Sequence, residues 1–285
     1  MSKKLSMKFA LVTDNFGDML NMIIPRDLFG IDIQHTNNYY TARTTGIGSY
    51  LDSYFWNESR LCGLPFTRKA VMNAANILFP PTQIWSTGFI SYPAGKEVSL
   101  RGEQINISSV RGELSKKRIE SILGRSLNIS TGDGGLLVRK LIPKQEKKYE
   151  LGIIPHLRET GEGIYTKIAA KFPKAKMIDV REDPYKVLKN IDSCEYILSS
   201  SLHGLICSDS FGIPNMRIVT SQNLLGDGFK FDDYYSSFGI ESNRIKVDTP
   251  DNLPTINQII DSYSMDNGQA ERKMEEITEA FYKFI

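Results

Sequence analysis

The chain has 285 residues, of which 41% are hydrophobic and 24% charged, a composition that suits a globular protein with one large core or two smaller ones. A formal net charge of +2 provides no overall field that would favour nucleic acid or an anionic membrane, and no apolar run approaches the roughly 20 residues of a membrane-spanning helix. The three cysteines, Cys62, Cys194 and Cys207, are too scattered for a disulfide framework and form no C-x-x-C pair, so we expect a soluble cytoplasmic protein.

The N-terminal part alternates short apolar runs with amphipathic ones. We expect a first strand at Lys8–Thr13, then a loop and a helix in DNFGDMLNMIIPRDLFG, where Leu20, Ile23 and Ile24 keep helical spacing. Similar units follow where TTGIG opens into SYLDSYFW, at QIWSTGF, and where NISSVRG leads into the helix ELSKKRIESILG, closed by Gly124. This β-α alternation predicts a largely parallel sheet.

A polar, lysine-rich segment at 142–150, IPKQEKKYE, interrupts this pattern and is the best candidate for a linker. After it, strands are predicted in LGIIP, AKMIDV, EYILSS and NMRIVT, separated by helices in EGIYTKIAAKFP, DPYKVLKNIDSC and SLHGLICSDSFG. We therefore expect an N-terminal Rossmann-like domain over 1–145 and a C-terminal one over 146–265, each an α/β unit with a parallel sheet.

The last segment, 266–285, predicts an amphipathic helix that crosses back to the first domain. Met274, Ile277, Phe281 and Phe284 share one face, opposite a highly charged one.

The most informative segment is YILSSSLHGLICSDSFGIP at 196–214, where an apolar strand ends in three serines and a helix begins near Leu202 and stops at Gly212. Free backbone N–H groups and the helix dipole make such a turn an anion site, to which the hydroxyls of Ser200 and Ser201 can donate. His203 lies in the first helical turn, at the carboxyl end of a parallel strand, where ligands bind in open α/β sheets. The alternative is a structural histidine and serines that only cap the helix.

A second segment, GIIPHLRET at 152–160, places His156 and Arg158 in the loop after another strand. A guanidinium there is suited to grip a phosphate or carboxylate in a bidentate fork. Because both loops follow strands of one parallel sheet, we expect Arg158 and His203 to face a shared crevice. The alternative is that Arg158 forms a solvated surface pair with Glu159.

SSSLHGLICSDSFGIP, together with VRGELS, TGDGGLL, GIIPH, DNFGDMLN and GIGSYL, resembles the polysaccharide pyruvyl transferase family in motif content and order. The resemblance runs from about Asp14 to Pro214. It implies a fold similar to GT-B glycosyltransferases, with two Rossmann-like lobes facing a cleft, and phosphoenolpyruvate as the donor without a metal, nucleotide or other cofactor. It also implies a glycan or lipid-linked oligosaccharide as the acceptor, no nucleic acid partner, and peripheral association with polysaccharide-assembly machinery at the inner membrane face.

The family's Arg and His positions match Arg158 and His203, and the Leu before that His matches Leu202. Members often carry Arg where this chain has Ser201. This departure allows two interpretations: the donor differs, or another cation such as Arg111 or Arg139 compensates. The reaction that the resemblance implies joins the pyruvyl group to sugar hydroxyls as a ketal. Ketal formation needs an acid, an anion clamp and a base. We expect His203 to act as the acid or the phosphate partner and Arg158, with Ser200 and Ser201, to hold the donor.

The base is left open among His156 and acidic residues of two glycine-rich loops, because the positions of these residues depend on how the lobes close. The loop DNFGD offers Asp14 and Asp18, and TGDGG offers Asp133; each also suits a helix cap. The predicted catalytic set is His203, Arg158 and Asp18; the predicted substrate-binding set is Ser200, Ser201, Leu202, His156, Asn15, Gly17, Arg111 and Asp133, with no metal ligand.

Two other functions fit the same segments. One is a GT-B glycosyltransferase that uses a nucleotide sugar, because a helix start that binds an anion also suits a diphosphate. The other is a non-catalytic protein that binds a glycan or takes part in capsule assembly. The acceptor sugar and the oligomeric state are not encoded in any motif that we find.

Overall fold

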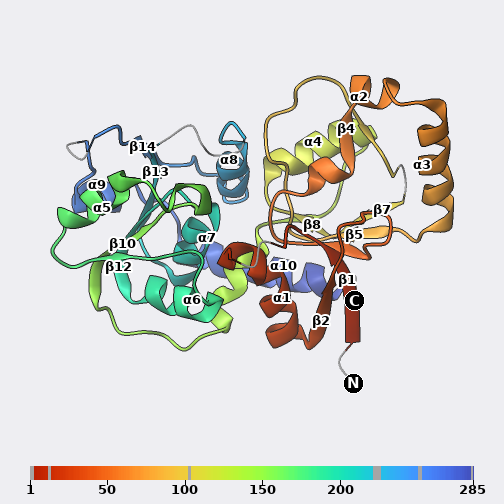
Figure 1. Ribbon diagram of the computed structural model, residues 1–285. Helices are drawn as coiled ribbons and strands as arrows, with labels where there is room; N and C mark the ends of the chain where they lie inside the picture. The colour runs from red at the N-terminus through yellow and green to blue at the C-terminus, as the bar shows by residue number, and fades with distance from the viewer. Residues whose placement is uncertain (1–2, 12–13, 102–103, 221–225, 250–251, 284) are drawn as a thin grey trace.

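The computed structural model describes residues 3–11, 14–101, 104–220, 226–249, 252–283 and 285. Two five-stranded parallel sheets form two lobes that lie side by side (Figure 1). The N-terminal sheet has the order β2 (Ile31–His35), β1 (Lys3–Lys8), β3 (Thr44–Thr45), β5 (Thr82–Ile84) and β7 (Ile105–Ile107). The C-terminal sheet has the order β11 (Ala175–Met177), β10 (Tyr149–Ile154), β12 (Cys194–Ser199), β13 (Asn215–Val219) and β14 (Arg244–Lys246). The predicted α/β class with two Rossmann-like lobes is confirmed.

Helices connect the strands of each lobe. The N-terminal lobe contains α1 (Phe16–Phe29), α2 (Glu58–Cys62), α3 (Phe66–Leu78), α4 (Glu113–Leu123) and the short 3₁₀ segments η1 (Leu51–Ser53) and η2 (Gly134–Lys140). Two small pairs, antiparallel β4 (Phe55–Asn57) with β6 (Glu97–Ser99) and parallel β8 (Ser109–Val110) with β9 (Ser130–Thr131), complete it. The C-terminal lobe contains η3 (Leu157–Glu159), α5 (Gly163–Ala170), α6 (Pro184–Asp192), α7 (Leu202–Phe211), α8 (Phe229–Ser236) and α9 (Ile256–Ser262).

The final helix, α10 (Asn267–Tyr282), packs on the N-terminal lobe, as predicted. The indole N–H of Trp85 donates to the Ile277 carbonyl at 3.0 Å, and the Phe281 ring stacks on Phe29 with centroids 4.1 Å apart. Met274 is buried on the same face, whereas Phe284 lies outside the described residues.

The prediction of the first strand from the sequence is wrong. The strand was expected at Lys8–Thr13, but β1 ends at Lys8, and Val12 and Thr13 lie outside the described residues. Strand length is set by the neighbours: β1 pairs with β2 up to Met7, and β3 offers only two residues of ladder. The apolar run that suggested a strand instead buries Phe9 against the edge of the His35 ring.

The predicted linker at 142–150 contains no helix or strand until β10 begins at Tyr149. The domain limits proposed from the sequence, at 145 and 265, remain predictions. Within the described ranges no helix is both long enough and apolar enough to cross a bilayer.

Candidate functional site

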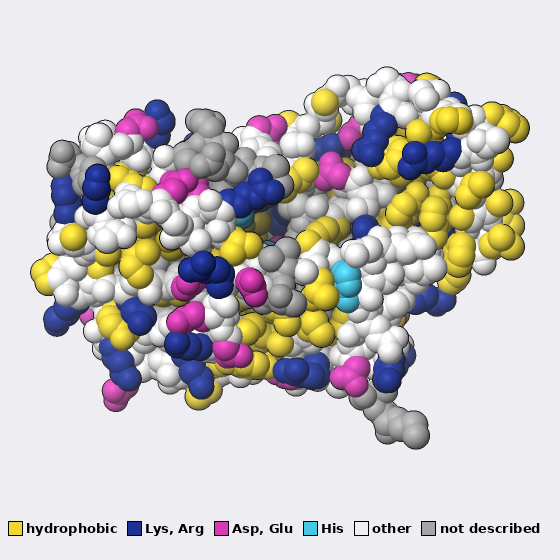
Figure 2. Space-filling view, viewed as in Figure 1, with side chains coloured by type: hydrophobic (Ala, Val, Ile, Leu, Met, Phe, Trp, Pro, Cys, Tyr) yellow, Lys and Arg dark blue, Asp and Glu magenta, His cyan; other side chains and the backbone are white. Residues whose placement is uncertain are grey.

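A cavity of about 260 Å³ lies where the two lobes meet, and we call it the interlobe cavity. Figure 2 shows the molecule hollowed between the lobes. The volume is below the roughly 300–1,000 Å³ of sites for drug-sized ligands, so it suits a small molecule. The cavity is lined by Ala10, Asn15, Asp18, Gly48, Ser49, Tyr50, Ile90, His156, Ser201, Leu202, His203 and Lys230.

The serine-rich turn leads from β12 into α7, which begins at Leu202 and ends at Phe211 before Gly212. Ser199 Oγ accepts from the Ser201 N–H at 2.9 Å and donates to the Ile154 carbonyl at 3.0 Å. Ser200 Oγ donates to Glu159 at 2.5 Å and accepts from the His156 N–H at 2.9 Å. Two of the three hydroxyls therefore hold the two loops together, and only Ser201 lines the cavity. Ser200 does not line the cavity, because its hydroxyl bonds within the protein, and its role in substrate binding stays a prediction.

His203 lies in the first turn of α7 against the start of α1. A Cβ added to Gly17 would lie 2.2 Å from His203 Nδ1, so only glycine allows this approach. His203 Nε2 is buried and has no hydrogen-bond partner. Burial, the charge of Lys230 and that of Arg111 lower the pKa of His203 to about 3, so its imidazole is neutral near pH 7.

The loop after β10 turns His156, and not Arg158, toward the cavity. His156 Nδ1 accepts from the backbone N–H of Arg158 at 3.2 Å, and burial and Lys230 lower its pKa to about 4. The Arg158 side chain is exposed and does not line the cavity. The expected convergence of Arg158 and His203 is therefore observed for their loops but not for the two side chains.

Asp18 lies on the N-terminal side of the cavity and is only 8% exposed. Its carboxylate accepts from Asn15 Nδ2 at 2.8 Å and from the Tyr50 hydroxyl at 3.2 Å. Burial raises the pKa of Asp18 to about 6, because the charged form loses hydration that two hydrogen bonds only partly replace.

Lys230, at the start of α8, is the charged cavity residue that was not predicted from the sequence; the other lining residues outside the predicted sets are Ala10, Gly48, Ser49, Tyr50 and Ile90. The side chain is 8% exposed, and its ammonium makes no hydrogen bond or ion pair with any residue that the structure describes. Burial, followed by the charges of Arg111 and Arg217, lowers its pKa to about 8. The glycine-containing run GDGFKFDD at 226–233 was the available signal for a turn before a helix, but nothing in it indicated a ligand.

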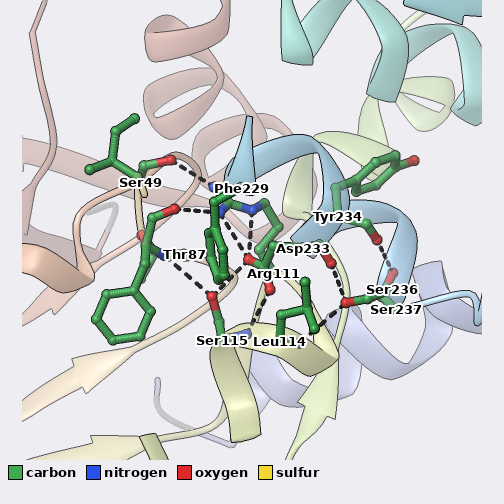
Figure 3. A network of polar contacts seen from close by, with 12 residues as sticks. Ser49, Thr87, Arg111, Leu114, Ser115, Phe229, Asp233, Tyr234, Ser236 and Ser237 are labelled. Carbon is green, nitrogen blue, oxygen red and sulfur yellow. Dashed lines mark hydrogen bonds and ion pairs between the residues drawn. The ribbon is translucent and has the colours of Figure 1, made fainter. Parts of the chain in front are cut away.

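Arg111 is fully buried in the network drawn in Figure 3. Its guanidinium donates to Asp233 at 2.9 Å, to Ser49 Oγ at 2.7 Å, and to backbone carbonyls of the N-terminal lobe. Asp233 also accepts from the N–H and the hydroxyl of Ser115, both at 2.7 Å. Helix α8 is thus held to the N-terminal lobe, which places Lys230 at the cavity one turn earlier. Arg111 does not line the cavity, because its charge is paired with Asp233, and its role in substrate binding stays a prediction.

Other predicted residues lie away from the cavity. Asp133 is fully buried and accepts from the Gly135 N–H at 2.8 Å, which caps η2; burial raises its pKa to about 6. Arg139 pairs with Glu271 at 3.2 Å beside a separate cavity of about 540 Å³. Asp14 is exposed and does not line the interlobe cavity.

The cavity combines groups suited to anion binding and proton transfer. Lys230 and the free N–H groups at the start of α7 attract an anion, while neutral His203 and His156 can donate hydrogen bonds to it. Asp18 provides a carboxylate on the opposite lobe. Among the residues with described positions, no three His, Cys, Asp or Glu side chains are grouped to hold a metal.

Comparison with known proteins identifies related chains. Residues 81–222 match the family model of polysaccharide pyruvyl transferases. The chain is 34% identical over 142 residues to the uncharacterized protein L143 of Acanthamoeba polyphaga mimivirus, covering 48% of this chain and 50% of that protein. It is 27% identical over 148 residues to the succinoglycan biosynthesis protein ExoV of Rhizobium meliloti (strain 1021), covering 50% and 45%. The chain spans about half the length of these curated relatives.

Solved structures resemble the whole chain more distantly. A Listeria monocytogenes protein provisionally assigned as a UDP-N-acetylglucosamine 2-epimerase is 10% identical, with a TM-score of 0.49 and coverage of 100% of this chain and 98% of that one. The glycosyltransferase SnogD from Streptomyces nogalater is also 10% identical, with a TM-score of 0.38 and coverage of 98% and 96%.

Proposed function

Because this chain belongs, through residues 81–222, to the polysaccharide pyruvyl transferase family, we propose that its interlobe cavity transfers a pyruvyl group from phosphoenolpyruvate to two hydroxyls of a sugar. The observation that carries the proposal is the unpaired, buried ammonium of Lys230 in one small cavity with the start of α7 and the unpartnered Nε2 of His203. The described partner of this ammonium is the Phe231 ring, 5.2 Å away, and no acidic side chain of the described residues forms an ion pair with it. A buried charge without a counter-ion is costly, so such a cavity favours an anionic ligand.

Phosphoenolpyruvate carries a phosphate and a carboxylate on one three-carbon unit, which suits both the size and the charge of the cavity. Lys230 and the N–H groups at the start of α7 bind one anionic group, and the imidazoles donate to the other. Lys230 lines the same cavity as Ser201, where family members often carry Arg, and in this proposal its charge replaces the missing guanidinium. Arg158, which is exposed beside His156, binds the donor only from the rim.

The chemistry requires one proton to move onto carbon and two to leave hydroxyls. Protonation of the donor methylene makes C2 cationic, and the first sugar hydroxyl adds there as it loses its proton. The second hydroxyl then replaces phosphate at C2, closing the ketal. Of the two protons lost by the hydroxyls, one reprotonates the acid and the other leaves with the phosphate.

His203 is the proposed acid. Its imidazole is neutral in the free protein because burial and neighbouring cations disfavour a second positive charge. A bound phosphate supplies negative charge beside the ring and raises its pKa, so the ring takes up a proton when the donor is present.

Asp18 is the proposed base. Its pKa of about 6 leaves it ionised near neutral pH and close enough to that pH to accept a proton. The Tyr50 and Asn15 hydrogen bonds hold the carboxylate on the N-terminal side of the cavity, where we propose that the acceptor binds.

The acceptor is proposed to be a sugar of a surface polysaccharide or of its lipid-linked precursor, consistent with the succinoglycan biosynthesis relative. The protein would act in the cytoplasm, peripherally at the inner membrane face, with no cofactor beyond the donor.

The test is incubation with phosphoenolpyruvate and a panel of galactosides, mannosides and N-acetylhexosamines, followed by mass spectrometry and a phosphate assay. A product carrying one added pyruvate, with equimolar phosphate, is expected. Thermal stabilisation by nucleotide sugars but not by phosphoenolpyruvate would instead favour a glycosyltransferase.

A further inference from the structure

Helix α3 exposes an apolar face on the outer edge of the N-terminal lobe. Its Phe66, Val71, Ile77 and Leu78 side chains are 83%, 67%, 84% and 77% exposed, the highest values among the large hydrophobic side chains that the structure describes. Figure 2 shows hydrophobic side chains gathered along this edge, at the place of α3 in Figure 1. Single exposed apolar residues are common in soluble proteins, but four on one 13-residue helix form a patch.

These side chains lie in one stripe. At 100° per residue, the apolar residues Phe66, Ile77, Ala70, Ala74, Leu78 and Val71 cover about 140° of the helix surface, and Thr67 is the one polar residue of α3 within that arc. The opposite side faces the lobe, where Met72 and Ala75 are buried and Asn76 Nδ2 donates to the Leu100 carbonyl at 2.8 Å. The helix therefore has two apolar sides, and only one of them is covered by the lobe.

Basic side chains border the stripe without acidic neighbours in the chain. From Ser59 to Lys96 the sequence contains no Asp or Glu. Arg68 and Lys69 flank the stripe on α3, and Arg60 of the preceding α2 stacks on Trp56 at 3.9 Å from the ring centroid. None of these three cations forms an ion pair with a residue of the described ranges; Lys69, which is half-buried, donates to the Cys62 carbonyl at 3.0 Å. Lys96, at the end of the span, pairs with Glu58.

We propose that the face of α3, with Arg60 and Trp56, docks the protein in the plane of an anionic lipid bilayer. Membrane-surface helices combine exposed large apolar side chains, flanking Lys and Arg, and interfacial Trp, and this is the pattern here. The basic residues complement the phosphates of lipid head groups. A hydrophobic protein partner would not supply such negative charge, and a second copy of this face would bring like charges together. Docking of this kind goes beyond the proposed chemistry and does not depend on it.

The test is flotation of the whole chain with vesicles of phosphatidylcholine alone and of phosphatidylcholine with phosphatidylglycerol. We expect binding to the anionic vesicles that weakens with salt. The variant F66S/I77S/L78S should lower the partition coefficient by on the order of tenfold or more, and R68Q/K69Q by about fivefold per residue. The control M177S/I260S/Y282S removes exposed apolar side chains from other elements and should bind as the natural sequence does.

Three results would overturn the docking proposal. The first is that the natural sequence does not float with anionic vesicles. The second is that the control variant loses as much binding as F66S/I77S/L78S. The third is that the natural sequence is a dimer in light scattering and F66S/I77S/L78S converts it to a monomer. Because the exposed substitutions leave the core intact, the thermal unfolding midpoints should agree between variants. Pyruvyl transfer to a water-soluble acceptor is measured on the same samples; its absence with intact flotation would reject the proposed chemistry and leave the docking surface standing.

Discussion

The ammonium of Lys230 is charged near neutral pH although the residue is only 8% exposed. An ammonium with a pKa of about 8 is mostly charged at neutral pH and becomes neutral as the pH rises further. The KM for phosphoenolpyruvate should therefore rise about tenfold per pH unit above about pH 8, because the clamp loses its charge. A steady-state pH series measures this.

Two substitutions sharpen this prediction. Lys230→Arg should move the rise in KM to higher pH, because a guanidinium stays protonated, and Lys230→Gln should raise KM by about 10- to 100-fold at neutral pH. A pH profile that is identical in the natural sequence and in Lys230→Arg would contradict the assignment.

Asp18 combines a functional role with a cost in stability. Its pKa is about 6 in the folded protein against 3.8 for an unperturbed carboxyl, so the folded state holds the proton more tightly. Stability is lost as the pH rises from about 4 through 6. Asp18→Asn should raise the free energy of unfolding near pH 7.5 by roughly 1–3 kcal/mol, and turnover should fall about 10²–10⁴-fold. Urea unfolding at pH 7.5 and pH 5 measures the gain, which must shrink at the lower pH.

Helix α8 belongs to the C-terminal lobe by its position in the chain, but its buried Asp233 contacts the N-terminal lobe. Asp233 is fully buried and joins α8 to Arg111 and Ser115 of the N-terminal lobe. Removing one partner of a buried pair leaves an uncompensated charge, so Asp233→Ala should lower the free energy of unfolding by about 3–5 kcal/mol. Denaturant unfolding measures that loss.

The same substitution tests whether α8 positions Lys230. With the pair released, the KM for phosphoenolpyruvate should rise more than kcat falls, since Lys230 no longer points reliably into the cavity. Asp232→Asn is the matched control: within the described part of the chain this neighbour accepts only from the exposed Tyr92 hydroxyl, at 3.0 Å, and the substitution should change stability by about 1 kcal/mol or less. A variant R111M/D233L that regains stability but not donor affinity would show that placement, and not folding alone, was lost.

At the scale of the whole molecule, one apolar core crosses both lobes. It includes Met7 and Trp85 of the N-terminal lobe, Ile197 and Leu205 of the C-terminal lobe, and Phe281 of α10. Phe281→Ala should cost about 3–5 kcal/mol and destabilise both lobes together. Thermal unfolding followed by circular dichroism and by tryptophan fluorescence tests this, because both tryptophans lie in the N-terminal lobe. The two transitions should coincide, and two separated transitions would contradict a shared core.

Much of the C-terminal lobe was predictable from local patterns. The boundaries of α7, the αL glycine at Gly212 and the placement of His203 at the carboxyl end of β12 followed from the apolar run, the serines and the glycine. The N-terminal strand β1 was misplaced, and α8 was not identified, because their extents depend on partners far along the chain.

Side-chain periodicity and capping within short segments were enough to predict the α/β class, the order of the β-α units, an amphipathic C-terminal helix and the turn that carries His203. The packing of that last helix on the first lobe, and the set of charges that meet in the cavity, depend on contacts made in the folded protein. The tertiary structure turned Arg158 outward, enclosed Arg111 with Asp233 across 122 positions, and brought Lys230 opposite Asp18. Burial and charge pairing arise from contacts between segments distant in sequence, and local patterns do not encode them.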